Sequence, residues 1–172
     1  VDRMLGEVEA LMRPQAIAKG LALRIVVAPA LPGLITADET RVKQVLFNLL
    51  SNALRFTGAG GHIKIEASKP VPSENIIRLA VSDTGKGIAP ERQSSVFDSF
   101  TSGDTRGAGL GLALVRSFVE LHGGDVKMKS TPGTGTSVIC HLPETASPRA
   151  PRIELELGPE AVAARYRFYS YG

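Results

Sequence analysis

The clearest alternation of apolar and polar positions lies between residues 38 and 57, where two series of residues repeat with the period of an α-helix. The apolar series predicts a buried stripe and consists of Val42, Val45, Leu46, Leu49, Leu50 and Ala53. The polar series predicts a second stripe on the same helix and consists of Arg41, Gln44, Asn48, Asn52 and Arg55. Asp38 and Glu39 place two acids where the first turn would begin, which the helix dipole favours. The segment is therefore predicted to be an amphipathic helix.

Periodicity and turn residues divide the rest of the chain into further elements. The predicted helices cover residues 2–19, 91–97 and the stretch after Gly107, and Gly20 ends the first of them. The predicted strands cover residues 21–28, 62–67, 75–81, 127–130 and 137–142. These elements predict a two-layer α/β sandwich, in which a mixed sheet is covered on one face by helices.

Asn48 and Asn52 are unusual inside the long predicted helix, because an asparagine amide competes with the backbone for hydrogen bonds. Four residues apart, they lie on the same face of the helix. Mg²⁺ in nucleotide sites commonly takes one or two protein oxygens together with waters and substrate phosphates. The pair therefore suits a hydrated Mg²⁺, and an ordinary solvated helix face is the alternative that this segment leaves open.

Two glycine-bearing segments add the chemistry of a nucleotide site. In residues 83–88, Asp83 follows an apolar strand and can accept a hydrogen bond from an exocyclic amine, while the glycines allow a flat ring to approach the backbone. Residues 107–111 open an apolar-periodic helix, whose free N–H groups and dipole suit a phosphate. Common turn chemistry and glycines for close helix packing are the respective structural alternatives.

The order of these segments resembles the ATP-binding catalytic (HATPase) domain of two-component sensor histidine kinases. That domain belongs to the GHKL ATPases, which have the Bergerat ATP-binding fold and include type II topoisomerases, mismatch-repair ATPases and a class of chaperones. The resemblance extends from about residue 21 to residue 143. Five segments resemble, in order, the N box, the first glycine box, the F box, the second glycine box and the last glycine box: residues 48–57, 83–88, 96–100, 107–111 and 131–136.

The resemblance implies roles for the matching residues. Asn52, which is directly followed by Ala, is the expected Mg²⁺ ligand, Asp83 is expected to accept from the adenine amino group, and Thr136 is expected close to the base. Asn48 and Arg55 are the expected catalytic residues. The full set of expected ATP contacts is Asn48, Asn52, Arg55, Asp83, Gly85, Gly87, Ile88, Phe100, Gly107, Gly109, Leu110, Gly111 and Thr136.

Asn48 occupies the position at which related ATPases have a glutamate general base. An amide cannot take up a proton at neutral pH, so we expect little hydrolysis of ATP by water.

Three departures from the family pattern leave the expected ATP contacts in place. Arg55 replaces the usual Lys, the F box has Asp98-Ser99 instead of a Pro, and Arg106-Gly107 stands where two glycines are frequent.

Other nucleotide and metal motifs do not fit the sequence. There is no Gly-x4-Gly-Lys-Ser/Thr P-loop, and the glycine run continues to Leu112 where the dinucleotide fingerprint requires another Gly. One Cys and three scattered His do not suggest a zinc site. The net charge of +3 is slight and its basic residues are dispersed, so we expect no nucleic-acid binding.

The cellular location is predicted from the apolar runs and the N-terminal sequence. No apolar run approaches the roughly 20 residues that cross a bilayer, and no signal peptide is visible. We expect a cytoplasmic location and no membrane contact by this fragment, although the parent protein can be membrane-anchored. Cys140 lies in an apolar strand pattern and is expected to be a buried residue, not a reactive thiol.

The 172-residue chain is expected to hold one domain core. Residues 1–20 are expected to be the end of a dimerisation helix and its linker, residues 21–145 the ATP-binding domain, and residues 146–172 a C-terminal linker or extension. Residues 101–106 are small and polar and are expected to form a lid over the nucleotide. The chain begins without Met, and we expect it to be part of a longer protein.

The sequence contains no His-Glu-Leu-Arg-Thr-Pro-like acceptor box, and His62, His122 and His141 are expected to be structural or surface residues. The acceptor histidine is therefore expected on a cognate dimerisation domain outside this chain, in a homodimeric parent that acts on a response regulator or a downstream receiver domain. The predicted function is transfer of the ATP γ-phosphate to that histidine. The alternatives are a hydrolytic ATPase of the same superfamily and a degenerate, kinase-like module that regulates a partner by binding nucleotide.

Overall fold

The computed structural model describes residues 2–28, 31, 37–70, 75–98 and 111–144 of the chain. Several expectations fall outside these ranges, namely the lid at 101–106, the C-terminal segment 146–172, and Phe100, Gly107, Gly109 and Leu110. Within the described ranges, no helix combines the length and the apolar character that crossing a membrane requires.

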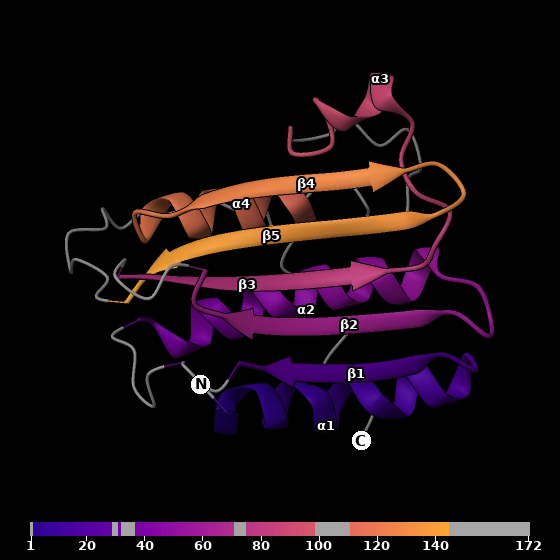
Figure 1. The fold of residues 1–172 in the computed structure, drawn as a ribbon, viewed down its shortest axis with the longest axis horizontal. Coiled ribbons are helices and arrows are strands. Elements are labelled where there is room, and N and C mark those ends of the chain that lie inside the picture. Colours follow the sequence, from indigo (N-terminus) through magenta and orange to yellow (C-terminus); the bar gives the residue numbers. More distant parts are fainter. Residues whose placement is uncertain (1, 29–30, 32–36, 71–74, 99–110, 145–172) are drawn as a thin grey trace, which may run out of the picture.

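Among the described residues, five strands form one mixed sheet with the order β1-β2-β3-β5-β4 (Figure 1). The strands are β1 (Ala22–Val27), β2 (His62–Ser68), β3 (Ile76–Asp83), β4 (Asp125–Thr131) and β5 (Gly135–Pro143). β1 and β2 are parallel, and all other neighbours are antiparallel. β1, the helix that follows it and β2 thus form a βαβ unit, while β2 and β3 form the predicted hairpin.

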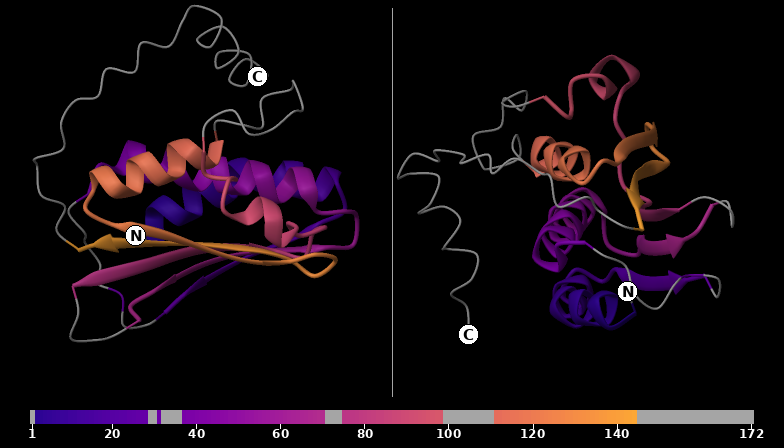
Figure 2. Two further views of the ribbon diagram at one scale, coloured as in Figure 1. Left: turned by 90° about the horizontal axis from the view of Figure 1, so that it is seen from above. Right: turned by 90° about the vertical axis from the view of Figure 1, so that its left-hand side faces the viewer.

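In the part of the chain that the structure describes, three helices cover one face of the sheet and none covers the other (Figure 2). They are α1 (Asp2–Ala18), α2 (Glu39–Phe56) and α4 (Gly111–Leu121). The predicted two-layer α/β sandwich with helices on one face is therefore confirmed.

A fourth helix, α3 (Pro90–Gln93), lies beside β4 and is shorter than the expected helix over residues 91–97. After it, the backbone N–H of Ser95 donates to the carbonyl of Arg92, and the N–H of Asp98 donates to the carbonyl of Ser95. These bonds span three residues, whereas an α-helix requires four, so the chain continues as successive tight turns.

The long helix α2 forms where the sequence pattern places it. A carboxylate oxygen of Asp38 accepts from the Arg41 N–H at 3.1 Å and caps the first turn, an arrangement that stabilises a helix by about 1 kcal/mol. At the other end, the Thr57 N–H and hydroxyl both donate to the Ala53 carbonyl, at 3.0 and 2.6 Å. The predicted apolar stripe is buried, and Leu54 joins it.

Helix α1 packs into the same core as the rest of the molecule. Its buried side chains are Met4, Leu5, Val8, Met12 and Ala16, and they belong to the hydrophobic cluster that includes the inner residues of β2 and β3. Lys43 of α2 pairs with Glu7 of α1 at 2.5 Å. The boundary expected at residue 20 thus falls within a continuous core, and the division of the chain at that residue stays a prediction.

Candidate nucleotide-binding site

The end of the N-box helix α2, the loop of the first glycine segment and the start of α4 at Gly111 meet at one end of the sheet, where β3 and β4 end and β5 begins (Figure 1). The backbone N–H of Lys86, in the loop after β3, donates to the carbonyl of Phe56 at the end of α2. A Cβ placed on Gly85 would lie 2.5 Å from that same carbonyl oxygen. A larger residue at position 85 would therefore push the loop away from α2.

The start of α4 lies against the polar stripe of α2. A Cβ placed on Gly111, the first residue of α4, would be 3.6 Å from the side-chain nitrogen of Asn52. The absence of a side chain on Gly111 lets the N-terminus of α4 lie close to Asn52. A helix N-terminus of this kind attracts anionic groups.

Asn48 and Asn52 are both half-buried on α2. The side-chain nitrogen of Asn48 is buried and has no hydrogen-bond partner among the described residues. An unsatisfied buried amide costs about 1–3 kcal/mol, which fits a group that gains its partner when a ligand binds. Among the described residues, no three His, Cys, Asp or Glu side chains gather as a metal cluster, so a cation here would rely on amide oxygens and on oxygens of a bound substrate.

Asp83 ends β3 and is held by backbone donors. One carboxylate oxygen accepts from the Gly85 N–H at 2.8 Å. Partial burial raises the pKa of Asp83 above its ordinary value, and hydrogen bonds from the backbone N–H groups of Gly85 and Thr136 offset part of that rise. The carboxylate is therefore oriented by the backbone and partly withdrawn from water.

Asp83, Thr136 and Ser130 form one row across three neighbouring strands. Asp83 pairs with Thr136 between β3 and β5, and Thr136 pairs with Ser130 between β5 and β4. Directly opposite residues point to the same face of a sheet. This face is the one that the helices cover, because the next residue in the row, Ile63 of β2, is buried in the core.

The loop after β3 is fixed to the end of β4. The Ile88 N–H donates to the Ser130 hydroxyl at 2.8 Å, and the side-chain nitrogen of Gln93 donates to the carbonyls of Ile88 and Ser130 at 2.8 and 3.0 Å. Gly87 has a φ of +68°, and a Cβ there would lie 2.1 Å from the Thr131 carbonyl oxygen. Only glycine satisfies both the backbone conformation and the close approach.

Positive charge gathers at the end of α2. Arg55 and Lys86 both lie over the ring of Phe56, at 5.3 and 4.8 Å from its centroid. Phe56 is 38% exposed although it is a large apolar residue. An exposed ring flanked by two cations suits a flat or anionic ligand.

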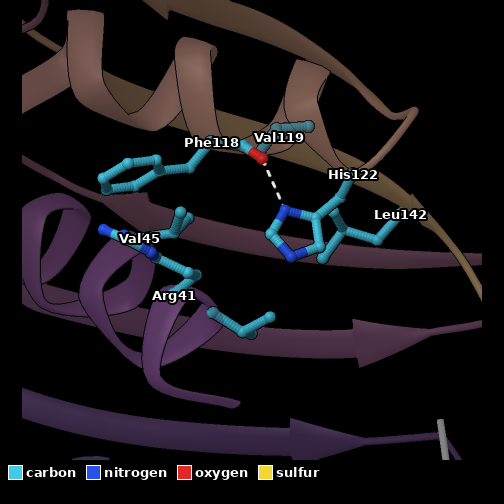
Figure 3. A pocket seen from close by; sticks show the side chains of 7 residues that line it. Arg41, Val45, Phe118, Val119, His122 and Leu142 are labelled. Carbon is cyan, nitrogen blue, oxygen red and sulfur yellow. Dashed lines mark hydrogen bonds between the residues drawn. The ribbon is translucent and has the colours of Figure 1, made fainter. Parts of the chain in front are cut away.

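A separate apolar depression lies at the other end of the helices, between the start of α2 and the end of α4 (Figure 3). It is lined by Arg41, Val42, Val45, Phe118, Val119, His122 and Leu142. Within it, Nδ1 of His122 donates to the Phe118 carbonyl at 2.7 Å, which agrees with the structural role expected of this histidine. The depression includes none of the predicted site residues.

The structure thus brings together the predicted site residues that it describes: Asn48, Asn52, Arg55, Asp83, Gly85, Gly87, Ile88, Gly111 and Thr136. Phe100, Gly107, Gly109 and Leu110 stay predictions. Ser130, Gln93 and Phe56 border the same region although the sequence motifs assign them no role. The signal for Ser130 was its spacing of six residues from Thr136, which suits opposite positions of a hairpin only once the strand register is known.

Comparison with known proteins identifies the family. Residues 37–146 match the family described as histidine kinase-, DNA gyrase B- and HSP90-like ATPase. Sensor protein DivL of Caulobacter vibrioides is 47% identical over 123 residues, which are 72% of this chain and 16% of DivL. Histidine protein kinase DivJ of the same organism is 38% identical over 143 residues, which are 80% of this chain and 23% of DivJ. The chain thus spans less than a quarter of either relative.

Solved structures share the fold. The catalytic domain of histidine kinase ThkA superimposes with a TM-score of 0.75 at 30% identity, covering 85% of this chain and 93% of that one. Full-length ShkA, solved in complex with AMPPNP, superimposes with a TM-score of 0.73 at 37% identity, covering 81% of this chain and 29% of that one. The chain therefore belongs to the histidine kinase-, DNA gyrase B- and HSP90-like ATPase family, and within that family it is an ATP-binding catalytic domain of the sensor histidine kinase type.

Proposed function

We propose that this domain binds Mg-ATP at the junction of α2, the loop after β3 and the start of α4, and presents the γ-phosphate to a histidine on a separate dimerisation domain. The observation that carries the proposal is the convergence of Asn48, Asn52, Asp83 and Gly111 at one end of the sheet, from three elements that are far apart in the sequence.

The residues present fit Mg²⁺ bound together with a nucleotide. Asn48 and Asn52 lie one turn apart on α2, and the buried amide nitrogen of Asn48 lacks a partner. Asn52 is proposed as the ligand through its amide oxygen, beside the N-terminus of α4. Bound there, Mg²⁺ would neutralise phosphate charge, which is its usual contribution to phosphoryl transfer.

The chain's own residues would bind and orient the nucleotide. Asp83, held by the Gly85 N–H, would accept from the adenine amino group, and Thr136 lies directly opposite it. Arg55 would place positive charge near the phosphates at the end of α2. Gly85 and Gly87 would shape the base pocket, and Gly107, Gly109 and Gly111 would surround the phosphates. Further nucleotide contacts are proposed for Ile88, Phe100 and Leu110.

Phosphoryl transfer, not hydrolysis, is the proposed reaction, because Asn48 offers no base for an attacking water. In-line attack by a histidine nitrogen would break the bond between the γ-phosphorus and the bridging oxygen, leaving ADP and phosphohistidine. The acceptor would belong to the cognate dimerisation domain of a homodimeric, cytoplasmically facing parent, with a response regulator or receiver domain next in the relay. Relatives that are named sensor proteins and histidine kinases support this assignment.

Calorimetry tests the binding step. The domain is expected to bind Mg-ATP with a dissociation constant in the micromolar to millimolar range, or roughly −4 to −8 kcal/mol. Removing Mg²⁺ with a chelator is expected to weaken the binding. Asn52→Ala should abolish this difference, while Ser51→Ala, on an exposed position of the same helix, should retain it. Absence of heat and of any thermal shift at millimolar Mg-ATP would refute the proposal.

A further inference from the structure

Ser130 of β4 has a hydroxyl whose hydrogen-bonding capacity is fully used. Its Oγ lies 2.8 Å from the backbone nitrogen of Ile88, 3.0 Å from the carbonyl oxygen of Gly135 and 2.9 Å from the hydroxyl oxygen of Thr136. A serine hydroxyl offers one hydrogen to donate and two lone pairs that accept. Three partners at these distances therefore determine the direction of each bond.

The Ile88 N–H can only donate, and the Gly135 carbonyl can only accept. Ser130 must accept from Ile88 and give its single proton to Gly135. Its remaining lone pair faces Thr136, so the Thr136 hydroxyl donates to Ser130. The proton of Thr136 is thus directed away from the site, and its oxygen presents only lone pairs to other partners.

Thr136 lies directly opposite Asp83, and an ionised Asp83 is also an acceptor without a proton. Two acceptors therefore stand side by side on the face that the helices cover. An amino group at position 6 of a purine has two N–H donors and complements such a pair. An oxo group at the same position presents lone pairs to lone pairs, which is unfavourable.

We propose that Ser130 is a positioning residue that holds Thr136 as a hydrogen-bond acceptor and thereby favours 6-aminopurine over 6-oxopurine nucleotides. This inference rests on the proposed function, in which Asp83 and Thr136 lie next to the base. Without the Ser130 hydroxyl, the Thr136 hydroxyl is free to rotate and to donate to an oxo group, so discrimination between the two bases falls.

Gln93 supports this arrangement from α3. Its side-chain nitrogen donates to the carbonyls of both Ile88 and Ser130 and so uses both of its protons. These two hydrogen bonds, one to the loop and one to β4, keep the Ile88 N–H directed at the Ser130 hydroxyl. Gln93→Ala is therefore expected to lower base discrimination in the same direction as loss of Ser130, by a smaller factor.

The chain offers a matched control on the opposite face of the sheet. Ser82 and Ser137 pair between β3 and β5, and their hydroxyl oxygens are 2.8 Å apart. They directly neighbour Asp83 and Thr136 in sequence, yet consecutive residues of a strand point to opposite faces. Ser137→Ala therefore removes a similar hydroxyl pair from the same strand without touching the acceptor row.

The experiment measures the affinities of Mg-ATP and Mg-ITP by calorimetry. Adenine has an amino group at position 6 and a bare N1, whereas hypoxanthine has an oxo group there and an N1–H, so the role of Ser130 is read from the change in the affinity ratio between variants. Ser130→Ala is expected to lower the ratio of ATP to ITP affinity by about threefold to tenfold. Ser130→Thr retains a hydroxyl and Ser137→Ala lies on the other face, so both variants should keep the affinity ratio of the unaltered domain. Thr136→Val should lower the ratio, and adding Ser130→Ala to it should cause no further change.

The outcomes separate the two proposals. If the unaltered domain binds neither nucleotide, the proposed function fails. If it binds ATP in preference to ITP but Ser130→Ala leaves the ratio unchanged, the role of Ser130 is refuted while the proposed function stands. Should Ser130→Ala fail to fold, Gln93→Ala decides, and an unchanged ratio in that variant refutes the inference.

Discussion

Gly111, the first residue of α4, lies beside Asn52 of α2, with the position of a hypothetical Gly111 Cβ only 3.6 Å from the Asn52 side-chain nitrogen. The two residues come from different sequence motifs, and their proximity places the start of α4 beside Asn52 in the proposed phosphate site. An added methyl group would touch the amide at ordinary van der Waals distance without an overlap.

Gly111→Ala is therefore expected to fold normally but to bind Mg-ATP more weakly, because the methyl group occupies space next to the proposed Mg²⁺ ligand. We expect a melting temperature within a few degrees of the unaltered domain and a several-fold loss of Mg-ATP affinity, on the order of 1 kcal/mol. Thermal melts and calorimetry check both parts. Gly58→Ala, at a position with no atom within 4 Å of the new methyl group, is the control, and an equal loss of affinity there would contradict the explanation.

The raised pKa of Asp83 predicts a cost of folding that depends on pH. Since burial raises the pKa of this carboxyl in the folded protein, the ionised form opposes folding. Below its unfolded pKa the group is protonated in both states and the penalty is absent. It develops as the pH rises through the unfolded and then the folded pKa, and it is complete above the latter.

Asp83→Asn should therefore have a higher melting temperature than the unaltered domain at pH 7, in the absence of nucleotide, and the advantage should shrink toward pH 4. The same variant should bind Mg-ATP more weakly, because an acceptor of the adenine amine is altered. Thermal melts across this pH range provide the check. If the melting temperature of Asp83→Asn minus that of the unaltered domain were lower at pH 7 than at pH 4, the raised pKa of Asp83 would be contradicted.

A comparison of Gly87 with Gly133 tests the close contact between the loop after β3 and the Thr131 carbonyl. Both have a positive φ, +68° and +75°, but a Cβ at Gly87 would overlap the Thr131 carbonyl, while nothing lies within 4 Å of one at Gly133. Alanine at Gly133 should cost about 1–2 kcal/mol of unfolding free energy from backbone strain alone. Alanine at Gly87 should cost more, on the order of 3 kcal/mol or above. Urea denaturation measures both, and equal costs would show that the loop relaxes away from Thr131.

Cys140 is expected to be chemically inert in the folded protein. It is fully buried in β5, and burial raises the pKa of its thiol to about 12. Because the thiolate is the reactive form, a thiol-specific reagent should not modify the native domain at pH 8 and should react fully after denaturation in guanidinium chloride. Rapid native labelling would show that the strand opens readily.

Local patterns predicted most of the fold because each depends on residues close together in the sequence. The apolar stripe of α2 and its Asp38 cap follow from spacing within one helix. The early end of α3 could not be predicted in this way. After Gln93, the choice between α-helix and successive turns depends on a few residues with weak helix preference. The packing of α1 into the sheet's helical layer also lies beyond sequence motifs, since it depends on contacts with α2 and β1.

The candidate site shows the same division. Asn52, Asp83 and Gly85 were identified because each belongs to a motif with its own chemistry. Ser130 was not, because its role depends on the register of β4 against β5 and on the loop at Ile88, which is 42 residues away in the sequence. Gln93 likewise acquires its role only when β4 lies beside α3.

Phosphate transfer between separate proteins tests the central claim most directly. ATP labelled at the γ-phosphate is incubated with this domain alone and then with the dimerisation domain of the same parent protein. The domain alone should acquire no stable label and release little inorganic phosphate. The added dimerisation domain should acquire acid-labile label slowly, because no tether raises its effective concentration, and only when its acceptor histidine is intact. Absence of label on the partner despite measured Mg-ATP binding, or acid-labile label on this domain that is lost when His62, His122 and His141 are all replaced, would contradict the account.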